Sequence, residues 1–229
     1  MNNPKTIRRL WCFRDMQFAE AEAWLTDMAR QGWRLDYLST VSARFVRCEP
    51  GSIEYRCMFN YYETYALRDQ WINENKKAGW ECIFNNDRLI VFYRQDSVGS
   101  DYLLYDPIQL KERLMQAKRN SIVVTLLVAV LFLAALTFAI WELLVQQTSL
   151  RLVLSSSLLV IVFAAILLDQ LNLIRSITLS LGSIKNGSLP IVERSIYRKI
   201  RVTRITFNAL SISLAVFALL YDFIELLGL

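Results

Sequence analysis

Three long apolar segments in the second half of the chain constrain its fold more than any other feature. They cover approximately residues 122–145, 152–174 and 205–227. A helix needs about 20 apolar residues to cross about 30 Å of hydrocarbon. A buried helix of a soluble protein rarely stays apolar on all faces over such a length. The sequence therefore predicts three transmembrane helices.

Basic residues border these segments unevenly. Lys and Arg tend to be retained on the cytoplasmic side of a bilayer. Seven of them lie in the basic loop or helix predicted at residues 175–204, whereas the connection at residues 146–151 carries only Arg151. We therefore expect residues 1–119 and 175–204 in the cytosol and the C-terminus outside. The residues expected to orient the chain are Lys118, Arg119, Arg198, Lys199, Arg201 and Arg204.

The N-terminal domain, predicted at residues 1–96, is expected to fold in the reducing cytosol. Its first residues lack the apolar core and cleavage site of a secretory signal peptide. No two of the four cysteines have the two-residue spacing of a redox or zinc motif. We interpret them as buried strand residues and expect no metal site and no cofactor. They are Cys12, Cys48, Cys57 and Cys82.

A sequence pattern in this domain occurs twice and indicates an internal repeat. A Trp is followed eight residues later by Gly-Trp, first at Trp24, Gly32 and Trp33, then at Trp71, Gly79 and Trp80. Each copy predicts an amphipathic helix that ends at the glycine, with the second Trp covering the core. The expected buried faces are formed by Phe18, Ala21, Leu25 and Met28 in the first helix, and by Leu67, Trp71 and Ala78 in the second.

Strand-like segments flank both helices. They occupy residues 7–14, 44–48, 53–62, 81–84 and 88–94, with turn residues between them. The order is β-α-β-β-α-β, with an extra short strand after each helix. This order predicts an α+β, ferredoxin-like sandwich, in which one antiparallel sheet carries both helices on one face.

Residues 97–121 are expected to form a linker and a juxtamembrane helix. Asp106 and Pro107 suit the N-cap and first turn of a helix that runs directly into the first span. Ser188 to Pro190 offer a similar start for a helix over residues 191–204. Two interpretations remain open: these helices transmit changes in the bilayer to the cytosolic domain, or their basic residues only bind anionic headgroups.

The doubled helix-Gly-Trp pattern also carries a family resemblance. The phrases WLTDMARQGWRL, EPGSIEYRCMF, KAGWE and IVFYR resemble the bacterial domain-of-unknown-function family 2812, over about residues 5–95. The resemblance implies a cytosolic domain followed by membrane helices in the bacterial inner membrane. It also implies a gene often found beside PadR-like transcriptional regulators, and no established catalytic residues.

Enzymatic and nucleic-acid functions are disfavoured by what the sequence lacks. The chain contains no His, which removes the commonest general base and the usual catalytic zinc ligands. No glycine-rich phosphate loop is present. Aromatic residues at alternate strand positions resemble a stacking surface, but the motif of RNA-recognition domains is absent. Residues 1–119 carry eighteen basic and sixteen acidic residues, so they form no strongly basic domain.

We therefore expect a non-enzymatic, membrane-bound sensor or regulatory module. Its cytosolic domain would bind a protein partner, a small effector or a second copy of the chain. The candidate docking residues are Trp11, Tyr55 and Tyr61, provided that their strand face is open. The alternative is an accessory subunit of a membrane transport or export complex.

Overall fold

The computed structural model divides the chain into two compact units. Unit 1 contains Met1–Ala117 together with Ser176–Arg201, and unit 2 contains Lys118–Arg175 with Val202–Leu229. Residues 176–201 therefore belong to the same unit as the N-terminal domain. The residues that the structure describes are 5–60, 62, 64–86, 88–95, 106–144, 150–185, 192–206, 209 and 213.

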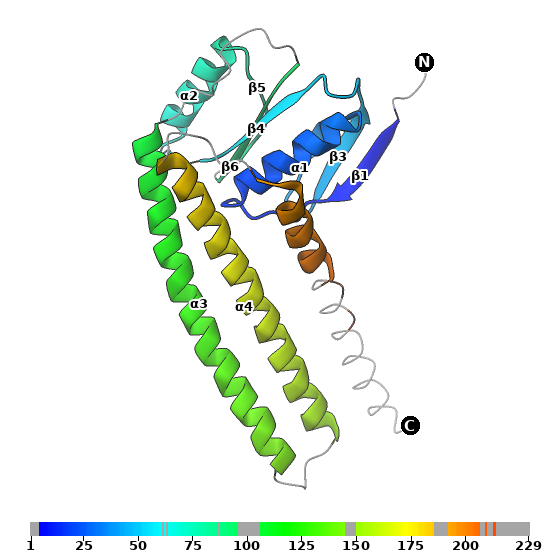
Figure 1. Ribbon diagram of the computed structural model, residues 1–229, viewed down its shortest axis with the longest axis vertical. Coiled ribbons are helices and arrows are strands. Elements are labelled where there is room, and N and C mark those ends of the chain that lie inside the picture. The colour runs from blue at the N-terminus through cyan, green and yellow to red at the C-terminus, as the bar shows by residue number, and fades with distance from the viewer. Residues whose placement is uncertain are drawn as a thin grey trace. The chain divides into compact units, whose positions relative to one another are not determined.

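Unit 1 opens with two successive β-α-β-β segments (Figure 1). The first consists of β1 (Thr6–Leu10), α1 (Phe18–Arg30), β2 (Trp33–Leu38) and β3 (Ser42–Arg47). The second consists of β4 (Glu54–Phe59), α2 (Tyr65–Lys77), β5 (Glu81–Asn85) and β6 (Leu89–Arg94). Each segment forms its own three-stranded antiparallel sheet, in the orders β1-β3-β2 and β4-β6-β5.

The two sheets have the same strand order and an irregularity at the same place. The third strand of each segment lies in the centre, and the hairpin that follows each helix contains an irregularity at the corresponding place, between Leu35 and Tyr37 in β2 and between Cys82 and Phe84 in β5. Such irregularities are typical of β-bulges, which increase local twist.

The predicted ferredoxin-like arrangement, with one sheet shared by all strands, is not confirmed. The reason lies in the strands that follow the helices. β2 pairs with β3 across a tight turn closed from Ser39 N to the Ser42 carbonyl, and β5 pairs with β6 across a turn closed from Asn86 N to the Leu89 carbonyl. Each helix is therefore followed by a complete hairpin, which adds to the first strand of its own segment.

The helix α1 has the predicted buried face, which Phe18, Ala21, Leu25 and Met28 share. It ends as expected at Gly32, which adopts φ +79° and donates its N–H to the Ala29 carbonyl. Any other residue at position 32 would be strained in this left-handed conformation. Its Cβ would also lie 3.1 Å from the Cys48 carbonyl oxygen.

The helix α2 follows the prediction only in part. The Thr64 hydroxyl caps it by accepting the Leu67 N–H at 3.3 Å, and Gly79 ends it at φ +94°. Trp71 is buried, but Leu67 is 51% exposed, so its predicted place in the core is wrong. Asn75 takes a buried position instead, because its side-chain amide donates to the Trp71 carbonyl at 3.0 Å.

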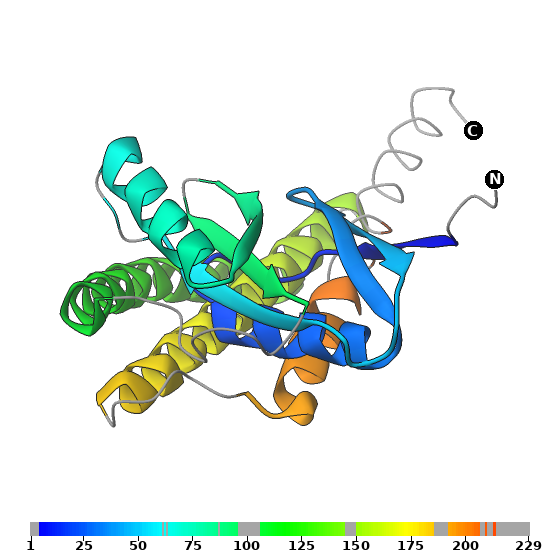
Figure 2. The same cartoon turned by 90° about the horizontal axis from the view of Figure 1, so that it is seen from above.

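The two segments share one core. The helix α1 of the first segment packs mainly against β4 of the second, and less against its own β2 (Figure 2). The largest side chains buried there are Trp24, Trp80, Tyr55, Phe18, Phe45 and Phe92. Two independent subdomains are therefore excluded for the described residues.

Among the residues that the structure describes, two helices are long and apolar enough to cross a membrane. They lie in α3 (Pro107–Leu144) and α4 (Leu150–Lys185). The Asp106 carboxylate caps α3 through the Ile108 and Gln109 N–H groups at 2.8 and 3.2 Å, so the predicted juxtamembrane helix does continue into the first apolar segment. α4 continues past the predicted boundary at residue 174. Most of the third predicted span, 205–227, lies outside the described residues.

Candidate functional site

The prediction that Tyr55 lies on an open docking surface is wrong. Its side chain is completely buried, and its hydroxyl accepts the Leu35 N–H at 2.7 Å, which links β4 to β2 of the other sheet. Burial raises the pKa of this phenol above its usual value. Tyr55 is inward because α1 covers the face of β4 that carries Tyr55 and Cys57. Tyr61 lies outside the described residues.

Trp11 also belongs to packing rather than to an open strand. β1 ends at Leu10, so Trp11 and Phe13 follow the strand instead of lying on it. The half-buried Trp11 ring contacts Phe13 and Trp24 edge to face, with centroids 5.2 and 5.8 Å apart. Trp24 contacts Phe45 in turn at 5.4 Å. This aromatic cluster fixes α1 against the first sheet.

The Trp of each Gly-Trp pair stacks against an arginine. The Arg47 guanidinium lies 4.7 Å from the Trp33 ring centroid, and the Arg94 guanidinium lies 4.7 Å from that of Trp80. Arg47 and Arg94 end the central strands and are separated by the same interval as the two tryptophans. The burial differs, because Trp33 is half-buried whereas Trp80 is fully buried.

A chain of ion pairs runs beside Trp80 and connects α1 with β4 and β6. Arg56 contacts Glu22 at 3.0 Å and Glu54 at 2.7 Å, and Arg94 contacts the second oxygen of Glu54 at 2.6 Å. The Glu22 carboxylate also accepts the Cys57 N–H at 2.9 Å. We call Glu22, Arg56, Glu54 and Arg94 the ion-pair chain. Sequence analysis missed it, although the regular positions of Arg47 and Arg94 were a usable signal.

Burial raises the pKa of Glu22 to about 7, although Arg56 and the Cys57 N–H both favour the charged form. The folded protein therefore binds a proton at this site more readily than the unfolded chain does. Between the ordinary carboxyl pKa and about 7, stability then falls as pH rises.

A pH titration of stability tests this shift. Between about pH 5 and pH 7 the free energy of unfolding should decrease by roughly 2–3 kcal/mol more in the wild type than in Glu22→Gln. The amide variant keeps a carbonyl for the Cys57 N–H but cannot titrate. The measurement is hydrogen exchange of β4 amides at several pH values, with Glu49→Gln as the exposed control. A steeper pH dependence in Glu22→Gln than in the wild type contradicts the assignment.

Residues 194–201 pack against α1 through specific contacts. The Tyr197 hydroxyl donates to Asp27 Oδ2 at 2.8 Å, and Arg194 contacts the same oxygen at 2.9 Å. One turn earlier on α1, the Trp24 ring lies 4.7 Å from the Arg201 guanidinium. We call these five residues the α1 clasp. Figures 1 and 2 show the helical segment, in orange, beside α1.

Burial indicates that the α1 clasp is a packed interface. Tyr197 is 2% exposed and Ile200 is 8% exposed. Burying side chains of this size stabilises an interface by about 1.5–3 kcal/mol each. Burial raises the pKa of the Tyr197 hydroxyl, and its hydrogen bond to Asp27 raises it further, so Tyr197 remains a donor at neutral pH.

Buried polar residues extend this interface toward the beginning of α1. Glu20 is 1% exposed and Ser176, on α4, is 3% exposed. Burial raises the pKa of Glu20, and the nearby Ser176 hydroxyl lowers it by a smaller amount. Glu20 Oε2 and Ser176 Oγ nevertheless form no hydrogen bond of ordinary geometry with any described residue.

The residues predicted to orient the chain have different surroundings. Arg201 covers Trp24, and Arg204 pairs with Asp169 within unit 2 at 2.5 Å. Lys118 is half-buried. The remaining three are exposed: Arg119, Arg198 and Lys199.

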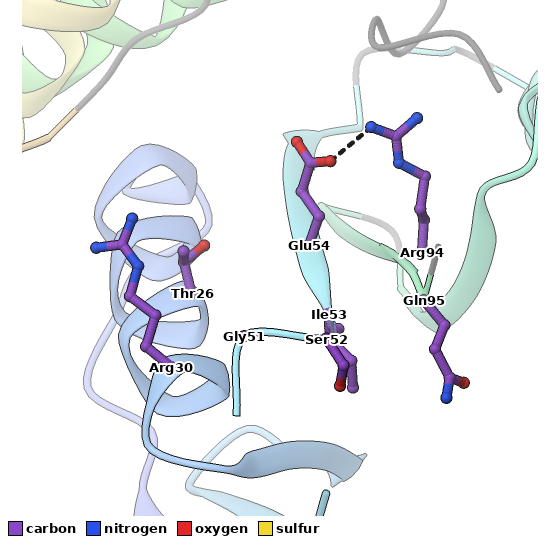
Figure 3. A pocket seen from close by; sticks show the side chains of 8 residues that line it. All are labelled: Thr26, Arg30, Gly51, Ser52, Ile53, Glu54, Arg94 and Gln95. Atoms are coloured by element: carbon purple, nitrogen blue, oxygen red, sulfur yellow. Dashed lines mark hydrogen bonds and ion pairs between the residues drawn. The ribbon is translucent and has the colours of Figure 1, made fainter. Parts of the chain in front are cut away.

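A pocket of about 400 Å³ lies between the end of α1 and the second sheet (Figure 3). Thr26 and Arg30 come from α1, and Arg94 and Gln95 from the end of β6. Glu54 lies between them and bonds to Arg94. Gly51, Ser52 and Ile53 complete the lining.

The cysteines have no reactive surroundings. All four are free thiols, and Cys12 and Cys57 are buried. Burial raises the pKa of Cys57, Cys82 and Cys48, which disfavours the nucleophilic thiolate. Within the described part of the chain, no group of three or more metal-ligating side chains comes together.

Comparison with known families agrees with the resemblance found in the sequence. Residues 17–127 match the family described as protein of unknown function (DUF2812). The match begins directly before α1 and continues into α3, beyond the region from which the resemblance was drawn. No curated protein and no solved structure matches the chain.

Proposed function

We propose that this member of the DUF2812 family is a membrane-bound regulatory module whose soluble domain is coupled to its membrane helices. The α1 clasp is the observation that supports the proposal. It ties α1, in the middle of the soluble core, to residues 194–201, and the same helix continues through residue 206 toward the third apolar segment. A change in one should therefore affect the other.

Membrane insertion is supported by the side chains of α3. Leu126, Leu127, Val130 and Leu133 are each between 57% and 63% exposed, on a helix that is long enough to cross a bilayer. Such a continuous exposed apolar surface is costly in water and favourable in lipid. We propose a multi-pass protein of the bacterial inner membrane, with unit 1 in the cytosol.

The way in which the charged side chains are paired favours a regulatory function over catalysis. The four charged side chains of the ion-pair chain are bonded to one another. Specific recognition rather than bond making suits such an arrangement. The PadR-like regulators implied by the family resemblance are a candidate class of functional partner.

Opening the α1 clasp tests the proposed coupling. We expect Tyr197→Ala, in the full chain in lipid nanodiscs, to increase hydrogen exchange at least about tenfold both in residues 194–206 and in α1, because the buried Tyr197 ring and its hydrogen bond to Asp27 are lost. Tyr197→Phe keeps the ring and should have a smaller effect. Arg198→Ala, on the exposed side of the same helix, should have none.

Affinity purification in mild detergent, with identification of the co-purified proteins, distinguishes a regulatory module from an accessory subunit of a transport complex. A regulatory module should lose its stoichiometric partners in Tyr197→Ala, because recognition depends on the state of unit 1. An accessory transport subunit should keep membrane-protein partners held by its spans. Retention of all partners, or conductance of the purified chain in liposomes, contradicts the regulatory proposal.

A further inference from the structure

The pocket beside the end of α1 has the size of a small-molecule site, and its lining is mostly polar. Its volume of about 400 Å³ lies within the range typical of ligand pockets. Its walls come from α1, the turn before β4, β4 itself and the end of β6. Ile53 is the one large apolar side chain among the lining residues, so the pocket offers no wall for an acyl chain.

The charges of the pocket favour an anion. Both oxygens of Glu54 are engaged, Oε1 by Arg56 at 2.7 Å and Oε2 by Arg94 at 2.6 Å, so its negative charge is offset twice. Arg30 is exposed at the rim and forms no ion pair with any residue in the described part of unit 1. The lining therefore carries excess positive charge beside a neutralised carboxylate.

The pocket wall is held in place before any ligand arrives. The Arg94 side chain is 5% exposed, stacks on Trp80 and bonds to Glu54. The Ala29 carbonyl at the end of α1 accepts N–H groups from both Gly32 and Gly51. These bonds hold the turn before β4 against the end of α1. Preorganised charges of this kind lose little entropy on binding.

We propose that this pocket binds an oxyanion, the phosphate or carboxylate group of a small soluble effector, with Arg30 closing over it from the rim. Guanidinium groups suit both oxyanions because they present paired donors in one plane. The Thr26 hydroxyl and the Gln95 amide are further polar groups at the same site. The role as effector rests on the regulatory function proposed above, whereas binding itself does not.

The test titrates inorganic phosphate, and separately succinate, into the full chain in zwitterionic nanodiscs at constant ionic strength, with heat of binding as the readout. We expect saturable binding to the wild type. Arg30→Gln should weaken it by about 10- to 100-fold, the effect of losing one charged hydrogen-bond donor. Arg9→Gln, an exposed arginine on β1, is the matched control and should bind like the wild type.

Several outcomes overturn the proposal. One is absence of saturable binding to the wild type, and another is equal weakening by Arg30→Gln and Arg9→Gln, which indicates general charge screening. A third is an Arg30-dependent response to anionic-lipid nanodiscs without any response to free phosphate or succinate, which assigns the site to a lipid headgroup. Clasp-dependent partner recovery in the same samples would leave the regulatory function standing in each case.

Discussion

Replacing Trp80 by Ala should lower the free energy of unfolding of unit 1 by about 3–5 kcal/mol, because the change removes a large, completely buried side chain. Trp80 lies beneath the guanidinium groups of Arg94 and Arg56, at 4.7 and 5.8 Å. The substitution would therefore also remove the ring against which the Arg94 end of the ion-pair chain packs. The largest effects should appear in β5 and β6.

Trp33→Ala is the matched control within the same chain. Trp33 follows the corresponding glycine and stacks on the corresponding arginine, but it is half-buried. Partial burial and one cation–π contact predict a loss of about 1–2 kcal/mol. Hydrogen exchange of the central-strand amides in the full chain reports both values. Equal losses of stability for the two variants would contradict the expected difference between Trp80 and Trp33. They would instead support the equivalent roles that the repeated sequence pattern suggests.

The sequence predicted the local features of unit 1 well. The ends of both helices at Gly32 and Gly79 and the cap of α3 at Asp106 follow from the chemistry of single positions, and the structure confirms them. The buried face of α1 follows from its 3.6-residue period in the same way. Such features depend on neighbours a few residues away, which a sequence displays directly.

The sheet arrangement could not be predicted by the same means. Alternation in β4 separates Tyr55 and Cys57 from Arg56, but alternation does not say which face is covered. That choice depends on α1, which packs on β4 and offers Glu22 to Arg56 at its edge. Likewise, the contact between Asp27 and Tyr197 joins residues 170 positions apart. No local pattern indicates such a pair.

The α1 clasp also constrains the membrane topology. Residues 194–201 contact α1, so in the proposed membrane protein they lie on the same side of the bilayer as α1. Both α3 and α4 have one end in unit 1 and their apolar part in unit 2. If both helices cross, the chain leaves the side of unit 1 along α3 and returns along α4. In the proposed topology, the basic residues near these ends predict that this side is the cytosol.

Reporter fusions should accordingly give an all-or-none result. A reporter that is active only in the periplasm should be silent when fused after Asn186, because that site lies between α4 and the clasp segment. The same reporter should be active after Leu229, because one further crossing by the third apolar segment separates the two sites. Fusion after Gln147, in the connection between α3 and α4, should also be active and serves as the positive control. Activity at Asn186 with silence at Gln147 would reverse the orientation, and silence at Leu229 alone would mean that the third segment does not cross.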